Sequence, residues 1–170
     1  MWWPEHFGLV TANLDRSVEF YSALLDREPL ERVLWKGEAA RYVADLLATP
    51  GLTLRAAFFH LPHSNTVLEV IEYSNIESGS PIAAPPTAVG AVHFGFYVDS
   101  IEDAAQRIQA AGGGFLAPPV AIPYGPYSGG RTAYFRDPDG VNLQVMEVSS
   151  RPGRLPVLKG SKSVAGYDTE

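Results

Sequence analysis

The sequence predicts an α+β fold made of two βαβββ modules in a pseudo-two-fold repeat, which together form a cupped, barrel-like sheet. One observation is that His6-Phe7-Gly8 returns as His93-Phe94-Gly95, 87 residues later. A second is that Leu68-Glu69-Val70-Ile71-Glu72 returns as Leu143-Gln144-Val145-Met146-Glu147, 75 residues later. Because neither module can bury its sheet face alone, we expect the two faces to close on each other.

A third observation is that turn residues repeat as well as strand motifs. On the 75-residue offset, Pro62-His63-Ser64-Asn65 falls on Asp137-Pro138-Asp139-Gly140. Asn65 then matches Gly140, and both residue types tolerate a left-handed backbone. The repeat is therefore predicted to extend through the turn between the last two strands of each module.

The first module is predicted over residues 1–74, beginning with a strand at 5–12 and a helix with apolar residues at helical spacing, from Leu14 to Leu25. Residues 29–36 alternate as a second strand. A helical period at 38–47, stopped by Pro50-Gly51, indicates a helical insertion near residues 38–48 and accounts for about a dozen residues that the second copy lacks. The remaining two strands are expected at 52–61 and 67–73.

The second module is predicted over residues 90–149, after a linker at 75–89 that is rich in Ser, Gly and Pro. It begins with a strand at 91–98 and a helix at 101–111, with Ser100 as N-cap and three glycines at the end. A loop rich in Pro, Tyr and Gly spans 117–130, and strands at 131–135 and 141–148 flank a hairpin turn. Residues 150–170 are expected to form a C-terminal tail, either loose or packed as an arm on a partner subunit.

The composition excludes several kinds of partner. A net charge of −6 and an isoelectric point near 5.2 argue against nucleic-acid and anionic-membrane binding, which need basic patches. The chain has no apolar run of about 18 residues and no signal-peptide pattern, so we expect a cytoplasmic protein with a small-molecule partner. It has no cysteines, so any metal must bind nitrogen and oxygen ligands.

The repeat places one His and two acid or amide positions in each module. A glycine stands two residues after both His6 and His93. Glu69 and Gln144 stand three residues before Glu72 and Glu147, so the two pairs point to opposite faces of their strands. Alternation alone leaves open which pair points inward; Glu72 and Glu147 are most simply solvated. A metal site and a metal-free pocket both fit this pattern.

These motifs resemble the vicinal oxygen chelate superfamily, which includes glyoxalase I, methylmalonyl-CoA epimerase, extradiol dioxygenases and the bleomycin- and fosfomycin-resistance proteins. The resemblance covers roughly residues 5–149. It lies in the two His-Phe-Gly motifs, in Leu14-Asp-Arg-Ser-Val-Glu-Phe-Tyr21, and in Tyr134-Phe-Arg-Asp-Pro-Asp-Gly140 followed by Leu143-Gln144-Val145. It implies a glyoxalase-like fold, and homodimers are common among members.

The resemblance implies a metal site made of His6, Glu69, His93 and Gln144. The family usually has Glu at the last position, so Gln144 is a departure. The set suits a divalent ion such as Zn, Ni, Co, Mn or Fe. Glu69 is then the catalytic base of a glyoxalase-type isomerase, epimerase or lyase, which acts on a small organic substrate through metal-bound oxygens and an enolate-type intermediate.

Two other functions fit the same residues. His6, His93 and Glu69 also form a two-His-one-carboxylate triad, as in Fe(II)-dependent dioxygenases. A metal-free small-molecule binding or resistance protein is the alternative from a different class. In either case, Tyr124, Tyr127 and Arg131, in or beside the long loop, are candidates for the substrate pocket, with an ordinary surface loop as the other interpretation.

Overall fold

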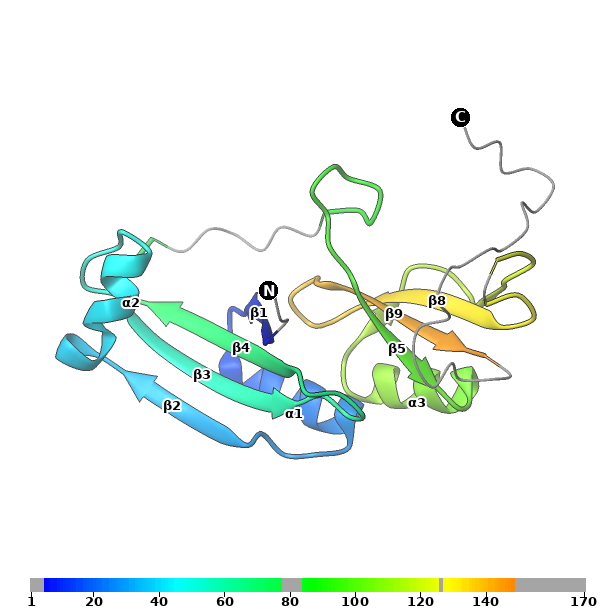
Figure 1. Ribbon diagram of the computed structural model, residues 1–170, viewed down its shortest axis with the longest axis horizontal. Coiled ribbons are helices and arrows are strands. Elements are labelled where there is room, and N and C mark those ends of the chain that lie inside the picture. The colour runs from blue at the N-terminus through cyan, green and yellow to red at the C-terminus, as the bar shows by residue number, and fades with distance from the viewer. Residues whose placement is uncertain (1–4, 78–83, 126, 149–170) are drawn as a thin grey trace. The chain divides into compact units, whose positions relative to one another are not determined.

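The computed structural model describes residues 5–77, 84–125 and 127–148, and these fall into two units (Figure 1). Unit 1 comprises Met1–Ala83 with the turn Asp137–Gly140, and unit 2 comprises Ala84–Arg136 with Val141–Glu170. The predicted tail at 150–170, and positions 78–83 of the predicted linker, lie outside the described residues. The predicted α+β class is confirmed, because each unit combines a sheet with a helix.

Unit 1 contains one four-stranded sheet in the order β1-β4-β3-β2. Its strands are β1 (His6–Val10), β2 (Glu31–Trp35), β3 (Thr53–His60) and β4 (Val67–Ser74), with α1 (Leu14–Leu25) after the first. β1 runs parallel to β4, while the β2–β3 and β3–β4 pairs are antiparallel. This order places the strand that carries His6 next to the strand that carries Glu69.

Helix α1 has an N-cap residue at its start and buries one of its faces. The side chain of Asn13 accepts a hydrogen bond from the backbone N–H of Arg16, which satisfies one of the free donors of the first turn. Tyr21 is fully buried on this helix, as expected of a core residue, and its hydroxyl donates to Asp137 Oδ2 at 2.8 Å. The turn Asp137–Gly140 thus contributes to the core of unit 1 through Asp137.

The predicted insertion forms a 3-10 helix, η1 (Gly37–Ala40), followed directly by α2 (Arg41–Leu46). Figure 1 shows α2 at the end of the sheet toward which β2 and β4 point. Its buried residues join a cluster with strand β3 and the segment before it: Ala40, Val43, Ala44, Leu52, Leu54 and Ala56. The insertion therefore packs on the sheet and is part of the hydrophobic core of the unit.

Unit 2 contains a five-stranded sheet in the order β5-β9-β8-β6, with β7 also paired to β8. Its elements are β5 (Phe94–Val98), α3 (Ile101–Ala110), β6 (Gly114–Phe115), β7 (Val120–Ala121), β8 (Arg131–Arg136) and β9 (Asn142–Glu147). Two short strands replace the single second strand of a βαβββ module. Pro118-Pro119 lies between them, and proline cannot donate to a strand ladder.

Two sequence expectations need correction. The strands form two separate sheets, and neither closes into a barrel in the described residues. The turn equivalence was also wrong in detail. The left-handed residue of the β3–β4 turn is His63 (φ 59°) and not Asn65, whereas Gly140 (φ 90°) is left-handed in the β8–β9 turn. The first turn is one residue longer, since His60 pairs with Val67 but Arg136 with Asn142, so equivalence shifts by one position there.

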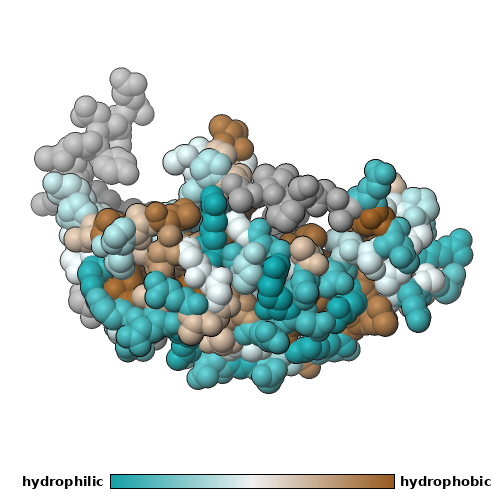
Figure 2. All heavy atoms as spheres, turned by 180° about the vertical axis from the view of Figure 1, so that it is seen from behind, coloured by the Kyte–Doolittle hydropathy of each residue, from teal (hydrophilic) through white to brown (hydrophobic). Residues whose placement is uncertain are grey.

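The surface of the described residues is mixed in character. Figure 2 shows hydrophobic patches interspersed among hydrophilic residues, and exposed apolar side chains include Val10, Leu34 and Leu46. None of the helices in the part of the chain that the structure describes has the length and apolar character that a membrane span requires.

We predict that Asp139→Asn weakens unit 1 at neutral pH but not in acid. Burial alone would raise the pKa of Asp139, but hydrogen bonds from Thr11 and Arg16 outweigh it and the pKa is lowered. A lowered folded-state pKa stabilises the fold above the unfolded value, about 3.9, and that stability is lost as pH falls through the folded value. Urea unfolding should show a loss of about 1 kcal/mol at pH 7.

The difference between wild type and Asp139→Asn should shrink as the pH is lowered below about 4. Asp26→Asn is the matched control. Asp26 is exposed at the end of α1 with φ 54°, a conformation that Asn also tolerates. A difference that stays constant or grows down to the lowest pH at which the protein folds would contradict this role of Asp139.

Candidate functional site

Two carboxylates on β4, three residues apart, point to opposite faces of the sheet in unit 1. Glu72 Oε2 accepts a hydrogen bond from the backbone N–H of Leu14, the first residue of α1, at 2.6 Å. Glu72 thus faces the helix and satisfies one of its free N-terminal donors, and the expectation that it is simply solvated was wrong. Glu69, an odd number of residues earlier, points to the face away from α1.

Unit 2 repeats this arrangement on β9. Glu147 Oε2 accepts from the backbone N–H of Ile101, the first residue of α3, at 2.7 Å. The solvated interpretation is corrected here as well. Gln144 points to the opposite face by the same alternation. Glu69 and Gln144 therefore lie on the sheet faces away from α1 and α3, which we call the far faces.

An arginine from the neighbouring strand completes each cap. Arg55 Nη2 donates to both oxygens of Asp15 at 2.8 Å, and its Nη1 lies 3.5 Å from Glu72. Arg131 repeats this contact, with Nη1 2.5 Å from Glu102 and Nη2 2.9 Å from Glu147.

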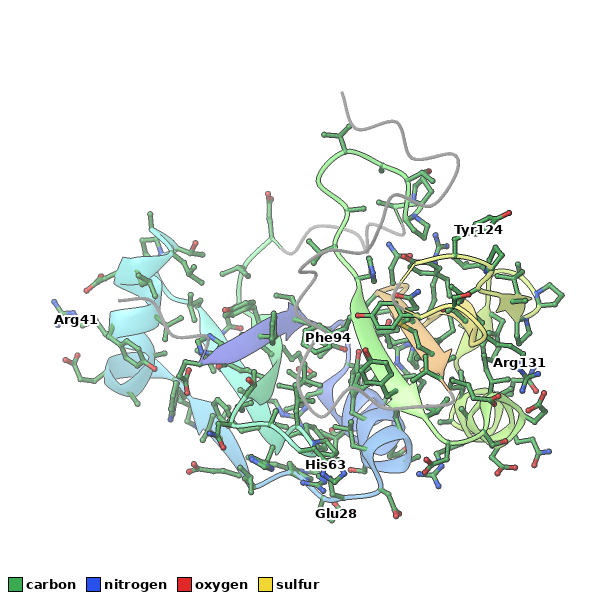
Figure 3. The ribbon with its side chains drawn as sticks, turned by 45° about the vertical axis from the view of Figure 1, so that its right-hand side comes forward. Glu28, Arg41, His63, Phe94, Tyr124 and Arg131 are labelled. Atoms are coloured by element: carbon green, nitrogen blue, oxygen red, sulfur yellow. The ribbon has the colours of Figure 1, made fainter. Side chains whose placement is uncertain are left out.

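The backbone hydrogen bond from Ile101, followed by the contact with Arg131, lowers the pKa of Glu147. Figure 3 shows Arg131 beside α3. The guanidinium of Arg131 therefore lies on the helix side of its sheet.

The far face of unit 1 brings two of the sequence-predicted ligands together. His6 Nε2 lies 3.6 Å from Glu69 Oε2, and His6 Nδ1 is hydrogen-bonded to the Glu5 carboxylate. Gly8 is paired with Glu69 across the strands, and a Cβ added to this glycine would lie 3.8 Å from Glu69 Oε2. The imidazole is half exposed and the carboxylate mostly buried, so both are reachable from one side of the sheet.

Aromatic side chains lie on the same far face, toward α2. The rings of Trp35 and Tyr42 are 5.6 Å apart, and Phe58 is in register with Glu69. Burial, and then the negative charge of Glu69, raise the pKa of Tyr73. No sequence motif marks these residues as part of a site, although alternation with Glu69 along β4 predicts that Tyr73 shares its face.

The far face of unit 2 carries Gln144 and places His93 beside a tyrosine. Gln144 Nε2 donates to Thr132 Oγ1 at 2.9 Å, and a Cβ added to Gly95 would lie 3.7 Å from Gln144 Oε1. His93, which immediately precedes β5, has its Nε2 3.3 Å from the Tyr134 hydroxyl. Thr132 and Tyr134 were missed by sequence reasoning, because their role depends on strand register and not on a motif.

The tyrosine-rich loop is organised at one end by close backbone packing. A Cβ added to Gly130 would lie 2.5 Å from the carbonyl oxygen of Glu147, so only glycine fits there. The ring of Tyr127 meets that of Tyr97 on β5 at 6.2 Å, and burial together with the hydrogen bond to Tyr127 raises the pKa of Tyr97 to about 12. Tyr124 is 63% exposed, at the outside of the loop in Figure 3.

The four sequence-predicted ligands thus occur as two pairs, one in each unit. His6 and Glu69 belong to unit 1, and His93 and Gln144 belong to unit 2. Within residues 5–77, 84–125 and 127–148, no three His, Asp or Glu side chains cluster closely enough to hold a metal ion. A metal site that uses these residues stays a prediction, as do the pocket roles of Tyr124, Tyr127 and Arg131.

Comparison with known proteins identifies similar folds. The model of the Glyoxalase/Bleomycin resistance protein/Dioxygenase superfamily matches residues 3–145. A glyoxalase family protein from Bacillus cereus shares 17% identity with a TM-score of 0.71, covering 85% of this chain and 92% of that one. A glyoxylase/bleomycin resistance protein/dioxygenase domain from a Frankia species shares 23% with a TM-score of 0.55, covering 87% and 98%.

A glyoxalase I mutant from Zea mays is also similar, at 19% identity and a TM-score of 0.51. The match covers 84% of this chain but only 45% of the maize protein. No curated protein matches the chain significantly. At these identities, the solved structures show the shared fold alone.

We predict that the two glutamates of β4 differ in their effect on stability. Glu72→Ala should lower the free energy of unfolding by about 1–2 kcal/mol, because it removes a charged acceptor from the start of α1. Glu69→Ala should change it by less than about 0.5 kcal/mol. Urea unfolding followed by circular dichroism measures both, with exposed Glu77→Ala as control. Equal losses in the two variants would show that the face assignment is wrong.

Proposed function

We propose that this chain, which belongs to the Glyoxalase/Bleomycin resistance protein/Dioxygenase superfamily, is a metal-dependent isomerase, epimerase or lyase of the glyoxalase type. Its protein ligands would be His6 and Glu69 from unit 1 and His93 and Gln144 from unit 2. One observation carries the proposal. In each unit, the acid or amide three residues before the helix-capping glutamate lies on the far face, beside the glycine that follows the repeated His.

The residues fit a divalent ion in donor chemistry. Two imidazoles, one carboxylate and one amide oxygen are nitrogen and oxygen donors of the kind that first-row divalent metals bind. The Glu5 carboxylate accepts from His6 Nδ1, which leaves the lone pair of Nε2 for an ion. When bound, the ion would supply a Lewis acid for an oxygen of the substrate.

Glu69 would act as the general base. Its carboxylate is 19% exposed, next to His6, and has apolar neighbours on the far face in Phe58 and Ile71. It would take a proton from the carbon next to a carbonyl and return it, either to the same carbon or to its neighbour. Because Glu69 is also a proposed ligand, it would have to loosen from the ion to accept that proton.

The side chains of the far faces favour a partly apolar organic substrate. Trp35, Tyr42 and Tyr73 supply aromatic surface in unit 1. In unit 2, Tyr127 is the loop residue that contacts a far-face side chain, Tyr97, and we propose it for substrate contact before Tyr124. Arg131 lies on the helix side, where its two carboxylate partners favour a structural role.

One observation favours the metal-free binding protein as a second candidate. The Tyr134 hydroxyl lies 3.3 Å from His93 Nε2. A hydrogen bond donated to this nitrogen would occupy the lone pair with which it would bind an ion. Ligand affinity that survives a chelator would identify this function. The Fe(II) dioxygenase, the homodimer and the cytoplasmic location remain predictions from sequence. Oxygen uptake with a catechol-like substrate would identify the dioxygenase.

We predict that both units are needed for metal binding. The purified protein should bind a divalent ion such as Co²⁺ or Zn²⁺, and His6→Ala and His93→Ala should each weaken binding at least 10-fold, because each removes one imidazole ligand. Isothermal titration of the metal-stripped protein measures the affinity. His63→Asn, at an exposed left-handed turn position, is the matched control and should bind like the wild type. Unchanged affinity in both alanine variants would refute the site.

We predict that Glu69→Gln strongly slows proton transfer while leaving the fold intact. The wild type in D₂O should catalyse exchange of the α-proton in at least one of a panel of small α-hydroxy and α-keto carbonyl compounds, followed by NMR. The variant should be slower by about 100-fold or more, because the base is lost. Exchange that is equally fast in Glu69→Gln would rule out Glu69 as the base.

A further inference from the structure

Gln144 takes part in a directed chain of hydrogen bonds on the far face of unit 2. Thr132 Oγ1 donates its single proton to the carbonyl oxygen of Val145 at 2.9 Å. Thr132 Oγ1 in turn accepts a hydrogen bond from Gln144 Nε2, also at 2.9 Å. Because a hydroxyl has one proton and two lone pairs, the group that faces it at position 144 must be a donor. The amide nitrogen meets this requirement.

The chain also determines where the other end of the amide points. With Nε2 held by Thr132, the oxygen Oε1 is directed toward β5, where it lies 3.7 Å from the position of a Cβ on Gly95. An amide has one oxygen and one nitrogen at nearly equivalent positions, and only the oxygen can serve as a metal ligand. The contact with Thr132 therefore orients the amide so that Oε1, the atom that could bind a metal, points away from Thr132.

The internal repeat supplies a comparison within the same molecule. Arg55 pairs with Glu72 and Arg131 with Glu147, so the position equivalent to Thr132 in unit 1 is Ala56. Ala56 has no hydroxyl, and it is fully buried in the core cluster beside α2. Unit 1 thus combines Ala56 with Glu69, and unit 2 combines Thr132 with Gln144. A carboxylate presents an oxygen whichever way it turns and needs no such partner.

We propose that Thr132 is a positioning residue that orients Gln144 as an oxygen ligand, and that the Thr132–Gln144 pair takes the place of a carboxylate ligand in unit 2. The inference rests on the proposed metal site. It explains how an amide stands where the family usually has Glu: the neighbouring hydroxyl removes the ambiguity between oxygen and nitrogen. Thr132 is needed for this orientation only while residue 144 is an amide.

The test is a double-mutant cycle read by metal affinity. Co²⁺ titration of the metal-stripped protein is compared for wild type, Thr132→Val, Thr132→Ser, Gln144→Glu and Gln144→Glu with Thr132→Val. Thr132→Val keeps the shape but removes the hydroxyl, and should weaken Co²⁺ binding about 10-fold. Thr132→Ser keeps the hydroxyl and should bind Co²⁺ about as tightly as the wild type. In the Gln144→Glu background, Thr132→Val should change affinity by less than about 2-fold, since both carboxylate oxygens are equivalent.

NMR of the metal-stripped protein gives a second measurement that does not depend on metal binding. The side-chain amide protons of Gln144 should exchange more slowly with water in the wild type and in Thr132→Ser than in Thr132→Val. Equal loss of affinity on Thr132→Val in the wild-type and Gln144→Glu backgrounds would overturn the inference, since it indicates a general structural effect. So would unchanged affinity and exchange in Thr132→Val, with the proposed metal site left standing. Absence of Co²⁺ binding in the wild type would overturn both.

Discussion

The organisation of each unit depends on a glutamate at or near the end of a central strand that accepts a hydrogen bond from the first backbone N–H of the long helix. Glu72 does this for α1 and Glu147 for α3, at 2.6 and 2.7 Å. The contact joins strand and helix, and an arginine from the next strand ties it to an acid in the first turn. A slip of one residue would turn every side chain to the other face, so this cap determines which face Glu69 and Gln144 occupy.

The two units share this frame but differ in chemistry on the far face. Unit 1 offers an imidazole beside a carboxylate, with aromatic residues toward α2. Unit 2 offers an imidazole hydrogen-bonded to Tyr134 and an amide hydrogen-bonded to Thr132. Equivalent positions therefore carry Ala56 and Phe58 in one unit but Thr132 and Tyr134 in the other. The proposed function would therefore use different side chains from the two units.

The sequence predicted the fold class and most elements, because the repeated motifs and the helix caps are local signals. It did not predict that Pro118-Pro119 splits a strand, or that His63, not Asn65, takes the left-handed turn position. It also left open which of Glu69 and Glu72 faces α1, since alternation separates the two faces of a strand without identifying them. That choice depends on a contact between Glu72 and Leu14, 58 residues apart. Thr132 and Tyr134 could not be predicted either, because only the register of strands distant in sequence brings them to Gln144 and His93.

We expect the far faces, and not the helix-capping faces, to carry the chemistry of this protein. The decisive measurement is an anomalous-difference map from crystals grown with Co²⁺. We expect cobalt density bounded by His6 and Glu69 from unit 1 and by His93 and Gln144 from unit 2, with Glu72 and Glu147 still hydrogen-bonded to their helices. Cobalt bound at Glu72 or Glu147, or only at other surface carboxylates, would contradict it.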